Sequence, residues 1–242
     1  MPTLSIETQT HGRVLVEGPA LKKTPGVISK KRLPMSFPPV VIVGFHGYAQ
    51  SAEDMMVVLR SLPGSDAWTV AAVQALHRFY TRGDQKIVAS WMTRQDREQA
   101  IADNVAYVDR VLDVLCEKDI GSRFPETTPD VFLLGFSQGA AMAYRAGLAG
   151  RHRIGGIIVV GGDVPPDVKS VPATRWPRVL VAAGNTDHWY TPDKVLADES
   201  FLGAHGVKHE LLRYEAGHVF PDDVRAAVAA FIADALPGTA GR

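Results

Sequence analysis

Ser137 lies at the centre of the sequence Gly-Phe-Ser-Gln-Gly at residues 135–139, which could perform nucleophilic chemistry. An apolar run at residues 131–134 precedes this motif and small residues follow it, as expected where a strand turns sharply into a helix. Such a turn strains its central residue, and flanking glycines allow the backbone to pass. The pattern predicts a nucleophile elbow that lifts the Ser137 hydroxyl clear of a sheet.

A serine hydroxyl is a weak nucleophile at neutral pH, so it needs a base and a carboxylate that orients the base. His218 follows a glycine on the expected loop between the last strand and the last helix, where an imidazole can reach over the sheet edge. Asp187 and Asp163 each follow an apolar strand and are rival candidates for the acid. The chain order Ser, Asp, His with strands between the partners favours Asp187.

Acyl transfer also requires two backbone donors for the oxyanion. Gln138, the residue after the nucleophile, is expected to supply one, and Tyr48 or its neighbour the other. Gly47 lets the loop after the expected strand at 40–45 bend toward the elbow. His46 is either a second base or, as we favour, a side chain that holds this loop by hydrogen bonding.

Strands that alternate with helices predict an α/β fold, with a mostly parallel sheet covered by helices on both faces. Expected strands lie near residues 40–45, 68–73, 131–135, 155–160, 178–183 and 208–213. Expected helices lie near residues 97–115, 138–149 and 222–236. A further helix should start at Ser51, because Asp54 three positions later completes a capping box.

The chain of 242 residues suits one domain, residues 1–242, whose lead-in at 1–39 should contain short strands at 4–6 and 14–16 and a Pro-rich loop. Residues 76–97 have weak periodicity and predict an irregular excursion that lines or covers a site, as a lid would. Asp193 and Asp198 are expected to cap a helix that starts near Pro192.

Composition excludes several classes of function. The 26 basic residues equal the 26 acidic ones, which argues against a nucleic-acid binder or a protein held on an anionic membrane surface. Cys116 is the only cysteine, so one chain can form neither a disulfide nor a thiolate metal cluster. His205 and His209 have the spacing of two metal ligands, but Gly206 lies between them, so we expect neither a metal nor a cofactor. The N-terminal residues lack a signal-peptide pattern and no apolar stretch could span a bilayer, so the expected location is cytoplasmic.

From about residue 40 to the C-terminus the chain resembles the phospholipase/carboxylesterase family of α/β-hydrolases, which includes the acyl-protein thioesterases. The motifs that carry the resemblance are Phe45-His46-Gly47, Ser90-Trp91, the elbow at 135–139, Gly184-Asn185-Thr186-Asp187 and Gly217-His218. The resemblance implies that Ser137 is the nucleophile, Asp187 the acid and His218 the base. It also implies that the amides of Tyr48 and Gln138 bind the oxyanion.

The chain departs from this family at two places. Tyr48 stands where many relatives carry a second glycine, and Trp189 with Tyr190 replaces a small aliphatic pair. With Trp91 as a pocket wall and Trp189 as a substrate contact, we expect a narrow aromatic site that cleaves short-chain carboxylic esters through an acyl-enzyme. Alternatives are an acyl-protein thioesterase or lysophospholipase, an amide hydrolase, and a hydrolase-fold ligand receptor without turnover. The expected partner is a small-molecule ester, and a homodimer is left open.

Overall fold

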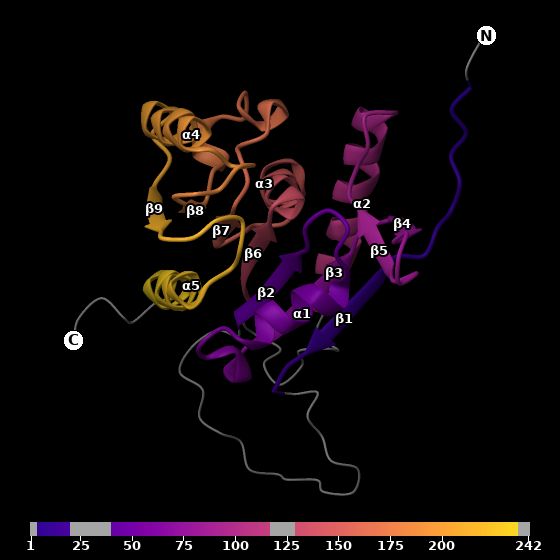
Figure 1. The fold of residues 1–242 in the computed structure, drawn as a ribbon, viewed down its shortest axis with the longest axis horizontal. Coiled ribbons are helices and arrows are strands. Elements are labelled where there is room, and N and C mark those ends of the chain that lie inside the picture. The colour runs from indigo at the N-terminus through magenta and orange to yellow at the C-terminus, as the bar shows by residue number, and fades with distance from the viewer. Residues whose placement is uncertain (1–3, 20–39, 117–128, 237–242) are drawn as a thin grey trace, which may run out of the picture.

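The computed structural model describes residues 4–19, 40–116 and 129–236, which form a sheet between two layers of helices (Figure 1). The seven strands of the sheet, in spatial order, are β1 (Arg13–Glu17), β3 (Thr69–Gln74), β2 (Val40–Phe45), β6 (Asp130–Phe136), β7 (Gly156–Val160), β8 (Arg178–Gly184) and β9 (His209–Tyr214). Only β1 is antiparallel to its neighbour in this sheet. The predicted α/β fold with a mostly parallel sheet is confirmed.

In the part of the chain that the structure describes, five α-helices cover the two faces of the sheet. They are α1 (Ala52–Arg60), α2 (Arg97–Cys116), α3 (Gln138–Ala149), α4 (Pro192–Ala204) and α5 (Asp222–Ala235), with short 3₁₀ helices at Ser65–Ala67, Pro166–Val168 and Ala173–Arg175 among the described residues. Strand β2 is buried along its whole length. Its residues alternate between a core shared with α2, α3 and α4 and a core shared with α1 and α5. Burial on both faces explains why β2 is a continuous β-branched run.

The strand order reverses direction at β2, because β3 lies on one side of it and β6 on the other. In open α/β sheets a crevice forms at such a switch point, outside the carboxyl ends of the strands. Residues 46–50 follow β2 and Ser137 follows β6, so both segments leave the sheet at this switch point. The topology thus brings the predicted elbow and the predicted oxyanion loop to one place.

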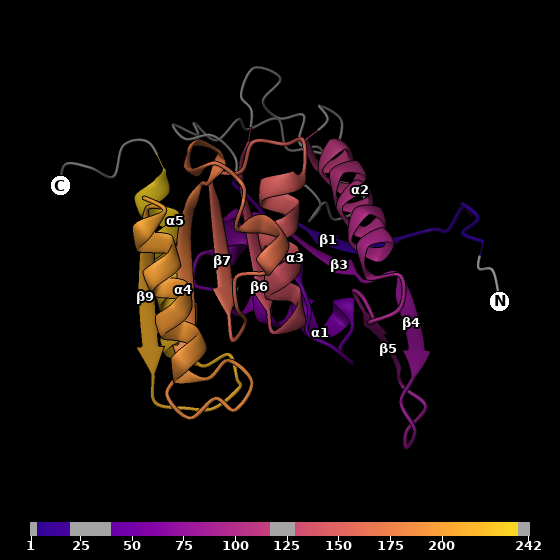
Figure 2. The same ribbon diagram turned by 90° about the horizontal axis from the view of Figure 1, so that it is seen from above.

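The expectations for residues 4–6 and 76–97 were wrong. Residues 4–6 form no strand, and Leu4 and Ile6 are exposed, because in the described part of the chain no neighbouring strand pairs with them. Residues 76–97 are not wholly irregular, since β4 (His77–Tyr80) and β5 (Ile87–Ser90) form an antiparallel hairpin. Figure 2 shows this hairpin projecting from the body of the molecule. Pairing between the two short strands supplies the regular structure that periodicity along one segment could not reveal.

The capping box that predicts the start of α1 is confirmed, because Ser51 and Asp54 exchange both expected hydrogen bonds. The expected caps of α4 were wrong. Thr191 is the N-cap residue and Asp193 lies in the first turn, whereas Asp198 lies within the helix and is buried. The predicted Pro-rich loop lies outside the described residues.

Candidate active site

Ser137 connects β6 to α3 with φ 54° and ψ −119°, a combination that residues with a side chain rarely adopt. Such a conformation costs about 1–3 kcal/mol and persists only where the surrounding structure holds it. Here the Ser137 amide donates to the carbonyl oxygen of Val160 at 2.9 Å, and the Ser137 carbonyl accepts from the Ala140 amide at 2.9 Å. Strain at a single serine between a buried strand and a helix is the local geometry of a nucleophile elbow.

Both glycines of the elbow are required by close backbone packing. A Cβ atom on Gly139 would lie 2.0 Å from the carbonyl oxygen of Phe45, and one on Gly135 would lie 2.2 Å from that of Gly139. The first turn of α3 therefore touches the end of β2 through main-chain atoms alone. This contact places the start of the helix beside the loop that follows β2.

We expect Gly139→Ala to lower the free energy of unfolding by about 1–3 kcal/mol, because the added methyl group overlaps fixed backbone atoms. Urea denaturation followed by circular dichroism measures the change. Gly203→Ala is the matched control: this exposed helical glycine has no atom within 4 Å of the added Cβ, so alanine should stabilise α4 by about 0.5–1 kcal/mol. Equal effects of the two substitutions would contradict the packing argument.

His218, on the loop between β9 and α5, contacts Asp187 after β8. Its Nδ1 atom lies 2.7 Å from Asp187 Oδ2, and the Asp187 side chain has an exposed fraction of 0%. Desolvation raises the pKa of the Asp187 carboxyl, but hydrogen bonds from His218 and from the amides of Trp189 and Tyr190 lower it, and the net effect is a lowered pKa. An ionised carboxylate can only accept a hydrogen bond, so in the neutral imidazole Nδ1 donates to Asp187 and Nε2 keeps its lone pair.

Asp163, the rival acid, has a side chain that faces solvent. Its side chain is 58% exposed, and its ion pair is with Lys194 at 3.8 Å rather than with an imidazole. Of the two candidates, the structure brings only Asp187 to His218.

Adjacent residues of the chain connect the surroundings of Ser137 with those of His218. The ring of Phe136 lies 5.0 Å from the His218 ring, centroid to centroid. A Cβ on Gly161 would lie 3.1 Å from His218 Nδ1, and one on Gly162 would lie 2.6 Å from the Ser137 carbonyl oxygen. Among the described residues Ser137 Oγ makes no hydrogen bond, and catalytic hydrogen bonds often tighten only when substrate binds.

Two backbone amides beside Ser137 are available to an oxyanion. The Gln138 amide is the first of α3 and has no acceptor within the helix, and its position at the helix N-terminus favours negative charge. The Tyr48 amide has no acceptor within the described ranges. A Cβ on Gly47 would lie 3.3 Å from the Ser137 Cβ, so the loop that carries Tyr48 lies against the nucleophile.

His46 holds this loop. Its Nε2 accepts from the Ala75 amide at 3.1 Å, and its Nδ1 lies 2.7 Å from the Gly47 carbonyl oxygen. Burial lowers the pKa of His46, which stays neutral, and the fully buried ring is not placed to act as a second base. The Gly47 amide donates to Gln50 Oε1 at 2.7 Å, which closes the turn.

Trp91 has a different place from the one expected. Its side chain is 0% exposed, packs edge-on against Phe45, and donates from Nε1 to the His46 carbonyl oxygen at 2.8 Å. The expectation that Trp91 forms a pocket wall is therefore corrected: the indole lies in the core and holds the oxyanion loop through this hydrogen bond. A buried tryptophan needs an acceptor for its N–H, and here the acceptor is a residue of that loop.

Sequence reasoning missed the role of the Gln138 side chain. Its Oε1 accepts from the Trp91 amide at 2.9 Å, and its Nε2 donates to Ser90 Oγ at 3.1 Å and to the Met92 carbonyl oxygen at 3.2 Å. The elbow is thus tied to the end of β5. The occurrence of Ser90-Trp91 together with the Phe-Ser-Gln elbow was the only available signal, and it carries no geometry.

Aromatic side chains remain exposed near the loops of the site. Tyr48 is 62% exposed and its ring lies 5.6 Å from that of Phe79 on β4, and Trp189 is 74% exposed two residues after Asp187. The Trp189 backbone is held by its amide, which donates to Asp187 Oδ1 at 2.7 Å, and by its carbonyl, which accepts from Lys194 Nζ at 3.0 Å. These two hydrogen bonds hold the backbone from which the exposed indole projects.

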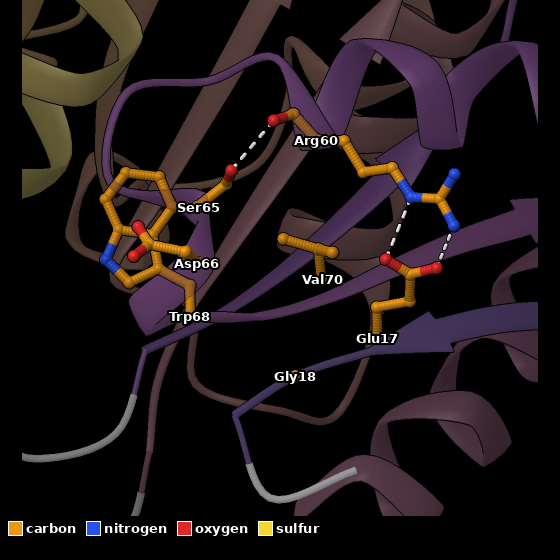
Figure 3. A pocket seen from close by; sticks show the side chains of 7 residues that line it. All are labelled: Glu17, Gly18, Arg60, Ser65, Asp66, Trp68 and Val70. Atoms are coloured by element: carbon orange, nitrogen blue, oxygen red, sulfur yellow. Dashed lines mark hydrogen bonds and ion pairs between the residues drawn. The ribbon is translucent and has the colours of Figure 1, made fainter. Parts of the chain in front are cut away.

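A pocket of about 230 Å³ is lined by seven residues, among them Glu17, Arg60 and Trp68 (Figure 3). It is formed around the amino end of β3 and the carboxyl end of α1, where Arg60 pairs with Glu17. This is the sheet edge opposite to the one that carries Ser137, so the pocket does not belong to the candidate active site. Across the described residues, no three His, Cys, Asp or Glu side chains are grouped to hold a metal ion.

The sheet order, the switch point and the elbow define an α/β-hydrolase fold. A family model described as Phospholipase/Carboxylesterase matches residues 83–232, and the chain belongs to this family. A comparison with curated proteins by sequence finds no match. In the described ranges, every helix is too short or too polar to cross a membrane.

Solved structures agree with this fold. Esterase PE8 is 21% identical, with 92% of this chain and 97% of that chain covered and a TM-score of 0.62. Acyl-protein thioesterase 2 of Zea mays is 16% identical, with 93% and 99% covered and a TM-score of 0.67. The Bacillus cereus carboxylesterase is 15% identical, with 93% and 94% covered and a TM-score of 0.65.

Proposed function

We propose that this chain is a serine hydrolase that cleaves short-chain carboxylic esters through an acyl-enzyme intermediate. The main support is the 2.7 Å contact between His218 Nδ1 and the buried Asp187 carboxylate, together with the loop after β7, in which Gly161 lies beside His218 and Gly162 beside the strained Ser137. Membership of a family described as phospholipase/carboxylesterase agrees with this chemistry.

Acylation starts when Ser137 Oγ attacks the ester carbonyl carbon and its proton passes to His218 Nε2. The carbonyl oxygen becomes an oxyanion, which the amides of Tyr48 and Gln138 bind. When the tetrahedral intermediate collapses, the bond to the alkoxy group breaks, and the alcohol leaves with the proton from His218. Water then attacks the acyl-enzyme with His218 as base, and the carboxylic acid and free Ser137 result.

The choice of short acyl groups is supported by the side chains around the site. Tyr48 follows Gly47, which lies against Ser137, and Trp189 lies two residues after Asp187; both are large side chains on segments whose backbones are held by hydrogen bonds. We expect these rings to leave little room for a long acyl chain at the nucleophile, whereas an acetyl or butyryl group would fit.

A substrate series tests the proposal. p-Nitrophenyl esters from acetate to palmitate are compared with acyl thioesters of the same lengths and with aminoacyl amides. We expect kcat/KM to be highest for the short oxygen esters. A maximum at palmitoyl thioester would instead support the thioesterase alternative, and tight binding of a small ester without turnover would support the receptor alternative.

Trp189→Ala should raise KM for a short ester by about tenfold with little change in kcat, because the exposed indole would contribute uniform binding of the substrate. Steady-state kinetics with p-nitrophenyl butyrate measures both constants. Leu196→Ala is the matched control, since this exposed side chain lies on α4 and not on the loop at residues 185–191 that carries Asp187, the acid loop. A KM for Trp189→Ala equal to that of the control would remove Trp189 from the substrate site.

A further inference from the structure

A buried carboxylate within α4 has no part in the chemistry described above. Asp198 is 3% exposed. Its Oδ2 accepts from the Val164 amide at 2.9 Å and from the Tyr190 hydroxyl at 3.1 Å, and its Oδ1 lies 3.5 Å from Lys169 Nζ. Burial raises the pKa of this carboxyl although these partners favour its ionised form. A buried carboxylate is costly, so its hydrogen-bond partners indicate what it does.

The partner Tyr190 connects Asp198 to the candidate catalytic acid, Asp187. Tyr190 is 2% exposed, and while its hydroxyl donates to Asp198, its amide donates to Asp187 Oδ1 at 3.1 Å. A single residue thus links the two carboxylates. The position of the Tyr190 backbone, and with it one of the hydrogen bonds that hold Asp187, depends on where the phenol is fixed.

The partner Val164 connects Asp198 to the candidate base, His218, and the candidate nucleophile, Ser137. The Val164 amide belongs to the loop after β7, in which Gly161 has φ +65° and contacts the His218 ring. Gly162 of the same loop packs against the Ser137 carbonyl. One carboxylate oxygen therefore fastens two loops, and between them these loops touch all three candidate catalytic residues.

We propose that Asp198 and Tyr190 are positioning residues that hold the acid loop and the loop after β7 in the geometry required for the reaction of Ser137, His218 and Asp187. The inference rests on the proposed function. Position 190 is one at which the family resemblance implies a small aliphatic residue. The inference gives the tyrosine found there a role that depends on its hydroxyl group. Neither residue contacts the reacting atoms, and each acts through Asp187 or through the loop after β7.

Three variants test the proposal. Tyr190→Phe removes one hydroxyl and keeps the ring, and should lower kcat about tenfold with KM nearly unchanged. Asp198→Ala removes both hydrogen bonds and should lower kcat about a hundredfold. Asp198→Asn keeps an acceptor oxygen for Val164 and Tyr190, so it should retain activity within about threefold of the original. All rates are normalised to the fraction of sites that a fluorophosphonate titrates.

Tyr107→Phe provides the matched control. The Tyr107 hydroxyl donates to the Arg13 carbonyl oxygen at 3.0 Å, between α2 and β1, so this variant also loses one phenol hydrogen bond. Its kcat should stay unchanged. If Tyr190→Phe behaves like Tyr107→Phe, or if Asp198→Asn loses as much kcat as Asp198→Ala, the positioning role is overturned.

A measurement without turnover separates this proposal from the proposed function. The proton between His218 Nδ1 and Asp187 should give a low-field NMR resonance, which we expect to shift or broaden in Tyr190→Phe and Asp198→Ala and to persist in Asp198→Asn and Tyr107→Phe. An unchanged resonance in the first two variants would refute positioning of Asp187. Absence of ester turnover in the original protein, with the resonance responding as expected, would refute only the proposed function.

Discussion

Replacing Ser137 by alanine is expected to reduce ester turnover by about four to six orders of magnitude while the protein stays folded. The substitution removes the only atom that forms the covalent bond to the acyl group in the proposed mechanism. It leaves the amides of Tyr48 and Gln138 in place, so a small residual rate from oxyanion binding should remain. Alanine must adopt the same positive φ as serine, so the strain at this position is about equal in the two proteins.

The measurement is kcat/KM with p-nitrophenyl acetate, together with a thermal melt to verify the fold. Ser200→Ala is the control, because this exposed serine lies on α4 and should be silent in both assays. Mass spectrometry after treatment with a fluorophosphonate should find the label on Ser137 and lose it in the variant. Labelling of a different residue would mean that the elbow is not the nucleophile.

The second large effect is expected for Asp187→Asn, which should lower kcat by about four orders of magnitude. Asp187 Oδ1 accepts from the amides of Trp189 and Tyr190, so an asparagine must direct its one carbonyl oxygen toward them. Its NH2 group then faces His218 Nδ1 and forces that nitrogen to be the acceptor. The proton moves to Nε2, which can no longer take one from Ser137.

Asp163→Asn is the matched control and should change kcat by less than about twofold, because its side chain is exposed to solvent. A larger kinetic loss in Asp163→Asn than in Asp187→Asn would reverse the assignment of the acid.

The stability of the protein should also depend on pH through Asp187. Because the pKa of Asp187 is lowered in the folded protein, its stabilising contribution is present above the ordinary carboxyl pKa and is lost as pH falls through the lowered value. Asp187→Asn should thus be less stable at neutral pH, with the gap closing in acid.

The order of strands and helices could be predicted because each element carries its own signal. The helix expected at 138–149 matches α3 at both ends, since the Gly-x-Ser-x-Gly turn marks where it must begin. The hairpin of β4 and β5 could not be predicted in the same way. Its strands have four residues each and are stabilised by pairing with one another, a property that no window along the chain contains.

Trp91 shows a similar limit within the site. A tryptophan next to a serine in a weakly periodic segment is equally compatible with a pocket wall and with the core. Its indole is buried because Phe45 and the His46 carbonyl lie beside it, and these residues are far away in the sequence.

The sequence by itself determined the nucleophile elbow and the α/β class, since a strained serine between glycines and a doubly buried strand are local properties of the chain. The tertiary structure decided which aspartate meets His218, which tryptophan stays exposed, and that Asp198 fastens two loops. Those outcomes depend on contacts between residues distant in the sequence: 31 positions separate Asp187 from His218, 34 separate Val164 from Asp198, and 45 separate His46 from Trp91. Only the packed sheet brings them within hydrogen-bond distance, because the carboxyl ends of its parallel strands meet at one edge.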